Sequence, residues 1–236
     1  MKNFFTILGG MGTLASESFV RVLNQRTIAK TDQDYLNYVL VNHATVPDRT
    51  AYILDNTKAS PVAALAEDIK QHDQIGPEFF VLTCNTAHTF YDELCEVTET
   101  PILHMPRLAA EKVVLDFKPT EDKVIKVCLL GTLGTVNSGV YHKEFEQKEG
   151  YELVTPSEKI QTDVMNLIYR DVKEHQFLNE SLFKDILDQV LVQEGCDVAI
   201  LGCTELSLMN EVTKHNYAAV DAQSVLIDET IKRARR

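Results

Sequence analysis

The chain of 236 residues is 44% hydrophobic and 25% charged, a composition typical of a globular protein with one large or two small cores. Its formal net charge of −12 at pH 7 argues against nucleic-acid binding, which needs clustered Lys and Arg. No run approaches the roughly 18 apolar residues that span a bilayer, and glycines interrupt the N-terminus too early for a signal peptide. We therefore expect a cytoplasmic protein that binds neither membrane nor nucleic acid.

In chain order, short apolar runs alternate with stretches of helical period. The apolar runs predict strands at residues 4–8, 38–43, 79–83, 102–105, 126–131, 152–156, 198–202 and 218–222. The stretches between them predict helices at residues 16–28, 60–72, 108–117, 162–174 and 180–195. Such alternation is typical of an α/β fold, in which helices cover mainly parallel sheets.

An internal similarity suggests that the chain forms two lobes. Residues 6–19 resemble residues 126–145, since each segment has a strand, a small Gly/Thr turn and a helix. The sequence therefore predicts two similar lobes, each a mainly parallel sheet flanked by helices, related by pseudo-twofold symmetry with the active site in the cleft between them. We expect residues 1–104 plus 212–236 in the first lobe and residues 105–211 in the second.

The five cysteines show no C-x-x-C pair and do not alternate with histidine at the spacing of metal ligands, so we expect free thiols and no metal. Cys84 and Cys203 stand out because each follows an apolar run that ends in a polar turn. Ligands of parallel α/β sheets bind at the carboxyl ends of strands, and a helix N-terminus there lowers the pKa of a thiol. Alternatively, each could be a buried small hydrophobe, which is the interpretation we give to the remaining three, Cys95, Cys128 and Cys196.

Five motifs extend this observation along nearly the whole chain: GGMG at 9–12, PDRTAYI at 47–53, CNTAH at 84–88, SGVY at 138–141 and GCTE at 202–205. Together they resemble the aspartate racemase branch of the aspartate/glutamate (Asp/Glu/hydantoin) racemase superfamily. CNTA and GCT alone are shared with glutamate and hydantoin racemases, but glutamate racemases usually have GCTH where this chain has GCTE. The resemblance implies an amino-acid racemase that needs no cofactor, interconverts L- and D-aspartate, with glutamate or a broader range as the alternative, and forms a homodimer.

The mechanism that this resemblance implies uses Cys84 and Cys203 as a pair. One thiolate removes the α-proton while the opposite thiol donates a proton to the other face. The carbanion then needs preorganised donors. The available groups are Asn85, Thr86, Thr204 and the backbone of Gly10 and Met11. By analogy between the paired turns, Thr132 would bind the α-carboxylate, although a turn threonine often bonds its own backbone instead.

Arg49 lies where the family places an arginine on the distal carboxylate, and its planar fork suits that group. Alternatively, Arg49 could pair with Asp48 or Asp55 at a loop surface. Aspartate racemases often carry a lysine shortly before the second-lobe DVM sequence, but here Thr162 occupies that position. Either Lys159, one turn earlier, reaches into the site, or the pocket is less cationic and the substrate range is broader.

Two further residues have a supporting role in this interpretation. His88 follows Cys84 by one helical turn and could tune the thiolate, or it could be a structural histidine. Glu205 is adjacent to Thr204 and is expected to orient groups near Cys203.

Competing functions stay open at this point. A non-catalytic amino-acid sensor on the same two-lobed cleft is one alternative. A superfamily isomerase or decarboxylase is another, although such decarboxylases tend to need one thiol and this chain has two. No lysine lies in an obvious strand-end turn where pyridoxal phosphate could form a Schiff base.

Overall fold

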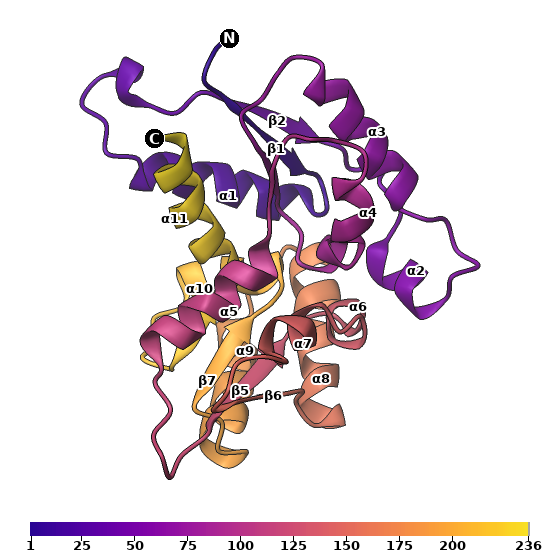
Figure 1. Ribbon diagram of the computed structural model, residues 1–236. Coiled ribbons are helices and arrows are strands. Elements are labelled where there is room, and N and C mark those ends of the chain that lie inside the picture. The colour runs from indigo at the N-terminus through magenta and orange to yellow at the C-terminus, as the bar shows by residue number, and fades with distance from the viewer. Residues whose placement is uncertain (236) are drawn as a thin grey trace.

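The computed structural model describes residues 1–235 and contains two parallel sheets of four strands each. The first sheet has the order β2-β1-β3-β4, with β1 (Phe5–Gly9), β2 (Tyr38–Asn42), β3 (Phe80–Leu82) and β4 (Ile102–Leu103). The second has the order β6-β5-β7-β8, with β5 (Ile125–Leu130), β6 (Tyr151–Val154), β7 (Val198–Leu201) and β8 (Ala219–Asp221). All eight predicted strands are confirmed, and the identical strand order confirms two similar α/β lobes (Figure 1).

Burial explains why these strands were visible in the sequence. The inner strands β1, β3 and β7 are buried at every residue, and their sequences are correspondingly apolar. The edge strands β2 and β6 are partly exposed. Parallel strands covered by helices on both faces form continuous apolar runs, which are easy to recognise.

The α-helices are α1 (Thr13–Arg26), α2 (Arg49–Leu54), α3 (Val62–Asp73), α4 (Tyr91–Cys95), α5 (Met105–Asp116), α6 (Leu133–Asn137), α7 (Val140–Phe145), α8 (Glu158–Met165), α9 (Glu180–Asp188), α10 (Thr204–Val212) and α11 (Ala222–Ala234). Two short 3₁₀ helices are η1 (Asp32–Asp34) and η2 (Thr86–Phe90). Two π-helical segments, η3 (Asn166–Glu174) and η4 (Gln189–Gln193), continue α8 and α9. The predicted helices at 162–174 and 180–195 are therefore helical, but each changes its winding part-way.

The division of the chain between the lobes differs from the expected one. The segment 212–236 was expected in the first lobe, but its strand β8 pairs in parallel with β7 of the second sheet. The pairing joins the backbones of residues 20 positions apart, such as Ala199 and Ala219, and local sequence does not reveal it. Helix α11, which follows β8, packs against both α1 and α5 (Figure 1).

Each lobe has a hydrophobic cluster of its own, and a further cluster spans both lobes. A single cluster of buried side chains joins Ile7 of the first sheet to Leu129 of the second, through Ala110 of α5 and Leu226 of α11. Burial of this apolar area stabilises the arrangement of the two lobes as well as each lobe. Within residues 1–235, every helix is too short or too polar to cross a membrane.

Candidate active site

The carboxyl ends of the inner strands meet at a cavity between the two lobes. Cys84 lies two residues after β3 and Cys203 two residues after β7, and both line this inner cavity. Their side chains are buried, with exposed fractions of 5% and 6%. The two thiols predicted from the sequence thus lie at one site, each delivered by a different lobe.

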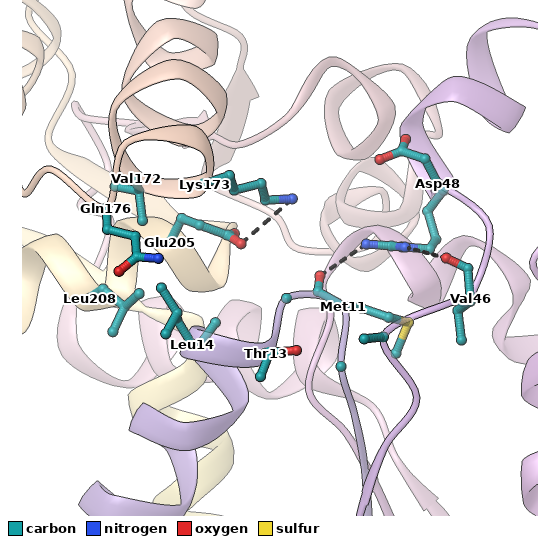
Figure 2. Close-up of a pocket in the computed structure, with 15 residues that line it drawn as sticks. Met11, Thr13, Leu14, Val46, Asp48, Val172, Lys173, Gln176, Glu205 and Leu208 are labelled. Carbon is teal, nitrogen blue, oxygen red and sulfur yellow. Dashed lines mark hydrogen bonds and ion pairs between the residues drawn. The ribbon is translucent and has the colours of Figure 1, made fainter.

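A larger pocket opens beside the inner cavity, with a volume of about 550 Å³, within the usual range for small-molecule sites. Both are lined by Met11, Asp48, Arg49, Lys173 and Glu205, so the pocket leads to the thiols. Figure 2 shows that the lining has two parts. Met11, Val46 and Asp48 lie on one side, and the apolar side chains of Leu14, Val172 and Leu208 lie on the other.

Cys203 is held by an acidic neighbour. Its Sγ donates to Glu205 Oε2 at 2.9 Å, and Thr204 Oγ1 donates to the same oxygen at 3.3 Å. Lys173 Nζ lies 3.5 Å from the other carboxylate oxygen, Oε1 (Figure 2). Glu205 is thereby connected to the thiol, to a hydroxyl and to a half-buried ammonium group.

In this environment the pKa of Cys203 shifts in the direction opposite to the one expected from the sequence. The thiol lies at the N-cap of α10, where the helix dipole was expected to lower its pKa. Burial and the Glu205 carboxylate instead raise the pKa of Cys203 well above its ordinary value, although Lys173 partly opposes them. Cys203 is therefore a protonated thiol at neutral pH.

Cys84 lies beside a cation. Arg49 is 8% exposed; its Nη2 donates to Met11 O at 3.0 Å and its Nη1 to Val46 O at 3.3 Å, while Nε–H has no partner among the described residues. Burial opposes the Arg49 charge, but the Cys84 thiol, followed by Asp48, leaves the pKa of Arg49 above its ordinary value. One donor of a buried guanidinium is thus available next to a thiol.

The surface ion pair considered for Arg49 is not formed. Asp48 Oδ1 caps α2 by accepting from Ala51 N at 2.7 Å. Asp55 accepts from Thr57 and pairs with Lys58. Arg49 is directed into the cavity because the first turn of α2, which begins at this residue, faces the Met11 turn.

The glycine turn shapes the pocket more than it supplies donors. Gly10 has φ of +90°, and a Cβ there would lie 2.5 Å from the backbone of His43, so glycine is required. Its N–H was expected to meet the substrate, but it donates to Ser16 Oγ at 2.9 Å. Met11 contributes its carbonyl to Arg49 and lines both cavities.

Four threonine hydroxyls connect the lobes beside the thiols. Thr86 of the first lobe bonds Thr135 and Thr132 of the second at 2.8 and 3.2 Å, and Thr50 donates to Thr132 at 3.1 Å. Thr132 also caps α6 by accepting from Thr135 N, as the alternative interpretation proposed. The inner cavity is lined by Thr50, Thr86, Thr132 and Thr204. Two of the threonines described here, Thr50 and Thr135, were not identified from the sequence.

His88 has a structural position. Its Nε2 accepts from Met105 N at 3.1 Å, so Nδ1–H donates to Cys84 O at 2.8 Å. Burial, followed by the neighbouring His104, lowers the pKa of His88 to about 3. The neutral imidazole joins the Cys84 turn to the start of α5 and does not line the inner cavity, which is the arrangement of a structural histidine.

The lysine expected near residue 162 comes from elsewhere. Thr162 is exposed on α8 and donates to Glu158 O, and Lys159 is exposed and donates to Gln189. The lysine that lines the inner cavity is Lys173, at the end of the π-helical segment η3. A π-helical turn shifts the phase of the helix, so α-helical periodicity from residue 162 does not place Lys173.

Burial opposes the Lys173 charge, but Glu205 and then Cys203 raise the pKa of Lys173, so the ammonium group is maintained. Tyr169, one turn earlier on η3, also lines the inner cavity and was not identified from the sequence. Within residues 1–235, no group of three or more His, Cys, Asp or Glu side chains is arranged to hold a metal ion.

Comparison with known proteins agrees with this geometry. The aspartate racemase of Picrophilus torridus has a similar structure, with a TM-score of 0.82 and 29% identity over 98% of this chain and 94% of that chain. The broad specificity amino-acid racemase RacX of Bacillus subtilis is 22% identical over 95% of each chain. A glutamate racemase of Persephonella marina is 31% identical over 60% of this chain and 51% of that protein.

Two parallel four-stranded lobes with a thiol from each in one cavity define the class of two-lobed α/β racemase folds. The family model for Asp/Glu/hydantoin racemases matches residues 8–230. The chain belongs to the Asp/Glu/hydantoin racemase family, and its similarity to the Picrophilus enzyme supports the aspartate racemase branch.

Proposed function

We propose that this member of the family is a cofactor-independent amino-acid racemase that interconverts L- and D-aspartate. The observation that carries the proposal is the pair of buried thiols at equivalent strand ends of the two lobes, both lining one cavity. Two proton-transfer groups on opposite sides of an α-carbon are what inversion requires.

The charges around the thiols support different roles for the two cysteines, one as the base and the other as the acid. An anion is favoured beside the Arg49 guanidinium, so we assign the thiolate to Cys84. Cys203, whose pKa is raised by burial and by Glu205, supplies the proton. This assignment describes the state that begins one direction of the reaction; the other direction begins with the roles exchanged.

The proposed reaction then balances without another reactant. The Cys84 thiolate takes the α-proton, and the electron pair of the C–H bond moves into the α-carboxylate, which becomes an enediolate. The Cys203 S–H delivers its proton to the opposite face of the α-carbon and is left as a thiolate. Turnover of the opposite enantiomer, or proton exchange with solvent through Glu205, restores the starting state.

Donors around the inner cavity would stabilise the enediolate. Asn85 Nδ2 is buried and has no partner among the described residues, and the hydroxyls of Thr86, Thr132 and Thr204 line the same cavity. Donors that are already oriented cost no reorganisation when charge develops.

Two cations, buried Arg49 and half-buried Lys173, favour a dicarboxylic substrate. Lys173 and Arg49 line both the outer pocket and the inner cavity, where the side chain of a bound amino acid would extend. A guanidinium with an unpaired Nε–H and an ammonium group can together hold a distal carboxylate.

A broader substrate range is the second candidate. The apolar wall of Leu14, Val172 and Leu208 gives the outer pocket room for side chains longer and less polar than that of aspartate. The similarity to RacX, which is named for broad specificity, supports the same possibility.

A panel of L- and D-amino acids tests the proposal by chiral chromatography and α-proton exchange, with no added cofactor. We expect the highest kcat/KM for aspartate. Comparable values for neutral amino acids would select the broader range. Tight aspartate binding without α-proton exchange would select a non-catalytic sensor.

A further inference from the structure

Tyr141 lies between the two cysteine turns without lining the cavity that they form. Its side chain is completely buried on α7 of the second lobe, and its hydroxyl donates to Asn85 Oδ1 of the first lobe at 2.6 Å. Its ring also packs on Gly202, where an added Cβ would lie 3.5 Å from Cε2. One side chain thus contacts the residue after Cys84 and the residue before Cys203.

The start of α7 places Tyr141 there. Gly139, the N-cap, has φ of +72°, a left-handed conformation that glycine adopts without strain. Ser138 Oγ accepts from Val140 N at 3.3 Å and donates to Thr135 O at 2.9 Å. The SGVY sequence at 138–141 therefore sets the direction of α7 and, with it, the position of the Tyr141 hydroxyl beside Asn85.

In its bond to Asn85 the Tyr141 phenol donates to Oδ1, which leaves the Nδ2 end of the amide free for the cavity. An asparagine side chain has one accepting and one donating end, and its flip is set by the hydrogen-bond partners. Tyr141 occupies the oxygen, so the Nδ2 amino group is directed away from it. Asn85 is 2% exposed and lines the inner cavity, and its Nδ2 has no partner within residues 1–235.

The phenol is suited to this task because it remains a donor. Burial, followed by Asp221 and Cys203, raises the pKa of Tyr141 well above its ordinary value. A flipped amide would turn its oxygen toward the cavity, where it would repel a carboxylate and the negative charge that develops on it.

We propose that Tyr141 is a positioning residue whose hydroxyl fixes the Asn85 amide so that Nδ2 donates to the α-carboxylate of the substrate as it becomes an enediolate. This inference rests on the proposed racemase function. Tyr141 itself does not touch the substrate; it acts through Asn85.

The test is a double-mutant cycle on Tyr141→Phe and Asn85→Ala, measured with aspartate racemisation. Tyr141→Phe keeps the ring and removes the bond. We expect it to lower kcat/KM roughly 10-fold to 100-fold, mostly through kcat, because the donor is needed most when charge develops. Asn85→Ala should cost at least as much, and the double variant should lose no more than Asn85→Ala alone.

Tyr151→Phe is the matched control. Tyr151 is in the same lobe, and its hydroxyl donates to Phe117 O at 2.7 Å, away from the cavity. We expect a lowered melting temperature in both tyrosine variants but wild-type kcat only in Tyr151→Phe. Wild-type kcat in Tyr141→Phe, or multiplied losses in the cycle, would overturn the proposal.

Asn85→Asp covers the case in which Tyr141→Phe does not fold. An aspartate keeps an acceptor for Tyr141 but has no amino group, so we expect a loss as large as that of Asn85→Ala; wild-type activity would contradict the proposal. If the wild-type protein does not racemise aspartate, the proposed function fails separately. In that case, calorimetric measurement of aspartate binding tests the positioning role of Tyr141. Weaker binding by Tyr141→Phe than by the wild type supports the role, and unchanged binding contradicts it.

Discussion

The turns that carry Cys84 and Cys203 occupy equivalent places in two lobes of the same strand order, yet the nearest charged side chain differs in sign. Cys84 is beside the Arg49 guanidinium, whereas the Cys203 thiol donates to the Glu205 carboxylate. The repeated fold thus supplies the symmetry that inversion of an α-carbon needs. The side chains break that symmetry, and the proposed division between a base and an acid rests on this difference.

The two turns are also connected to the rest of the fold by different interactions. On the Cys84 side, neutral His88 joins the turn to α5 through two backbone groups. On the Cys203 side, Glu205 connects the thiol to Lys173, which comes from a different helix. Changes at the two turns should therefore alter different properties of the enzyme.

The largest effects are expected at the thiols themselves. Cys84→Ser and Cys203→Ser should each lower aspartate racemisation by roughly 10³-fold or more, because a hydroxyl is a much weaker acid than a thiol and cannot exchange protons at the same rate. Chiral chromatography of the product measures the loss. Cys95→Ser, at the end of α4 and outside the cavity, is the control, and retained activity in either site variant would rule out a two-thiol mechanism.

The next largest effect is expected at Glu205. Glu205→Gln removes one of the causes that raise the pKa of Cys203 and leaves the opposing Lys173 cation in place. The thiol should then lose its proton at lower pH, so the alkaline limb of the kcat profile should move to lower pH, with kcat reduced roughly 10-fold to 100-fold.

Glu211→Gln is the control for that profile, since Glu211 is on the same helix but pairs with Arg21 at the surface. An alkaline limb that stays in place in Glu205→Gln would show that the carboxylate does not set the proton affinity of Cys203.

A smaller effect is expected at Lys173. Lys173→Met should raise KM for aspartate roughly 10-fold and change kcat less, because it removes a charge from the distal carboxylate and keeps the length of the chain. KM for a neutral amino acid should change less than KM for aspartate. The exposed Lys159→Met is the control, and an equal change for both substrates would contradict a role in side-chain recognition.

The smallest catalytic effect but a clear effect on stability is expected at His88. Its pKa is about 3 in the folded protein and near 6.5 when unfolded, so the unfolded chain binds more protons between these values. The contribution of neutral His88 is fully present above pH 6.5 and is lost as pH falls toward 3, by up to about 5 kcal/mol in the free energy of unfolding.

Denaturant titrations across this pH range measure that loss. His88→Asn should lower stability at pH 7 and flatten the dependence on pH, whereas exposed His175→Asn should not flatten it. An unchanged slope in His88→Asn would contradict the assignment of a buried neutral imidazole.

The strands and the two cysteine turns could be predicted because the information is local. Buried parallel strands are continuous apolar runs, and Cys84 and Cys203 stand where such runs end. The short helices α2, α6 and α7 contain five or six residues, which is too few for a helical period to be recognised.

The charges of the site could not be predicted in the same way. Lys173 reaches the cavity through a π-helical segment that changes the helical phase. The raised pKa of Cys203 depends on burial and on the direction of the Glu205 side chain, which the sequence alone does not give. The assignment of β8 to the second lobe depends on its pairing with β7, which is a tertiary contact.

The most direct test of two opposed thiols is the fate of the α-proton in deuterium oxide. At early times, NMR of a reaction begun with one enantiomer of aspartate should show deuterium at Cα of the product and protium at Cα of the remaining substrate. That result is expected when one thiol removes the proton and the other delivers a different one. Product that retains the protium of the substrate would instead indicate one base acting on both faces and would contradict the two-thiol account.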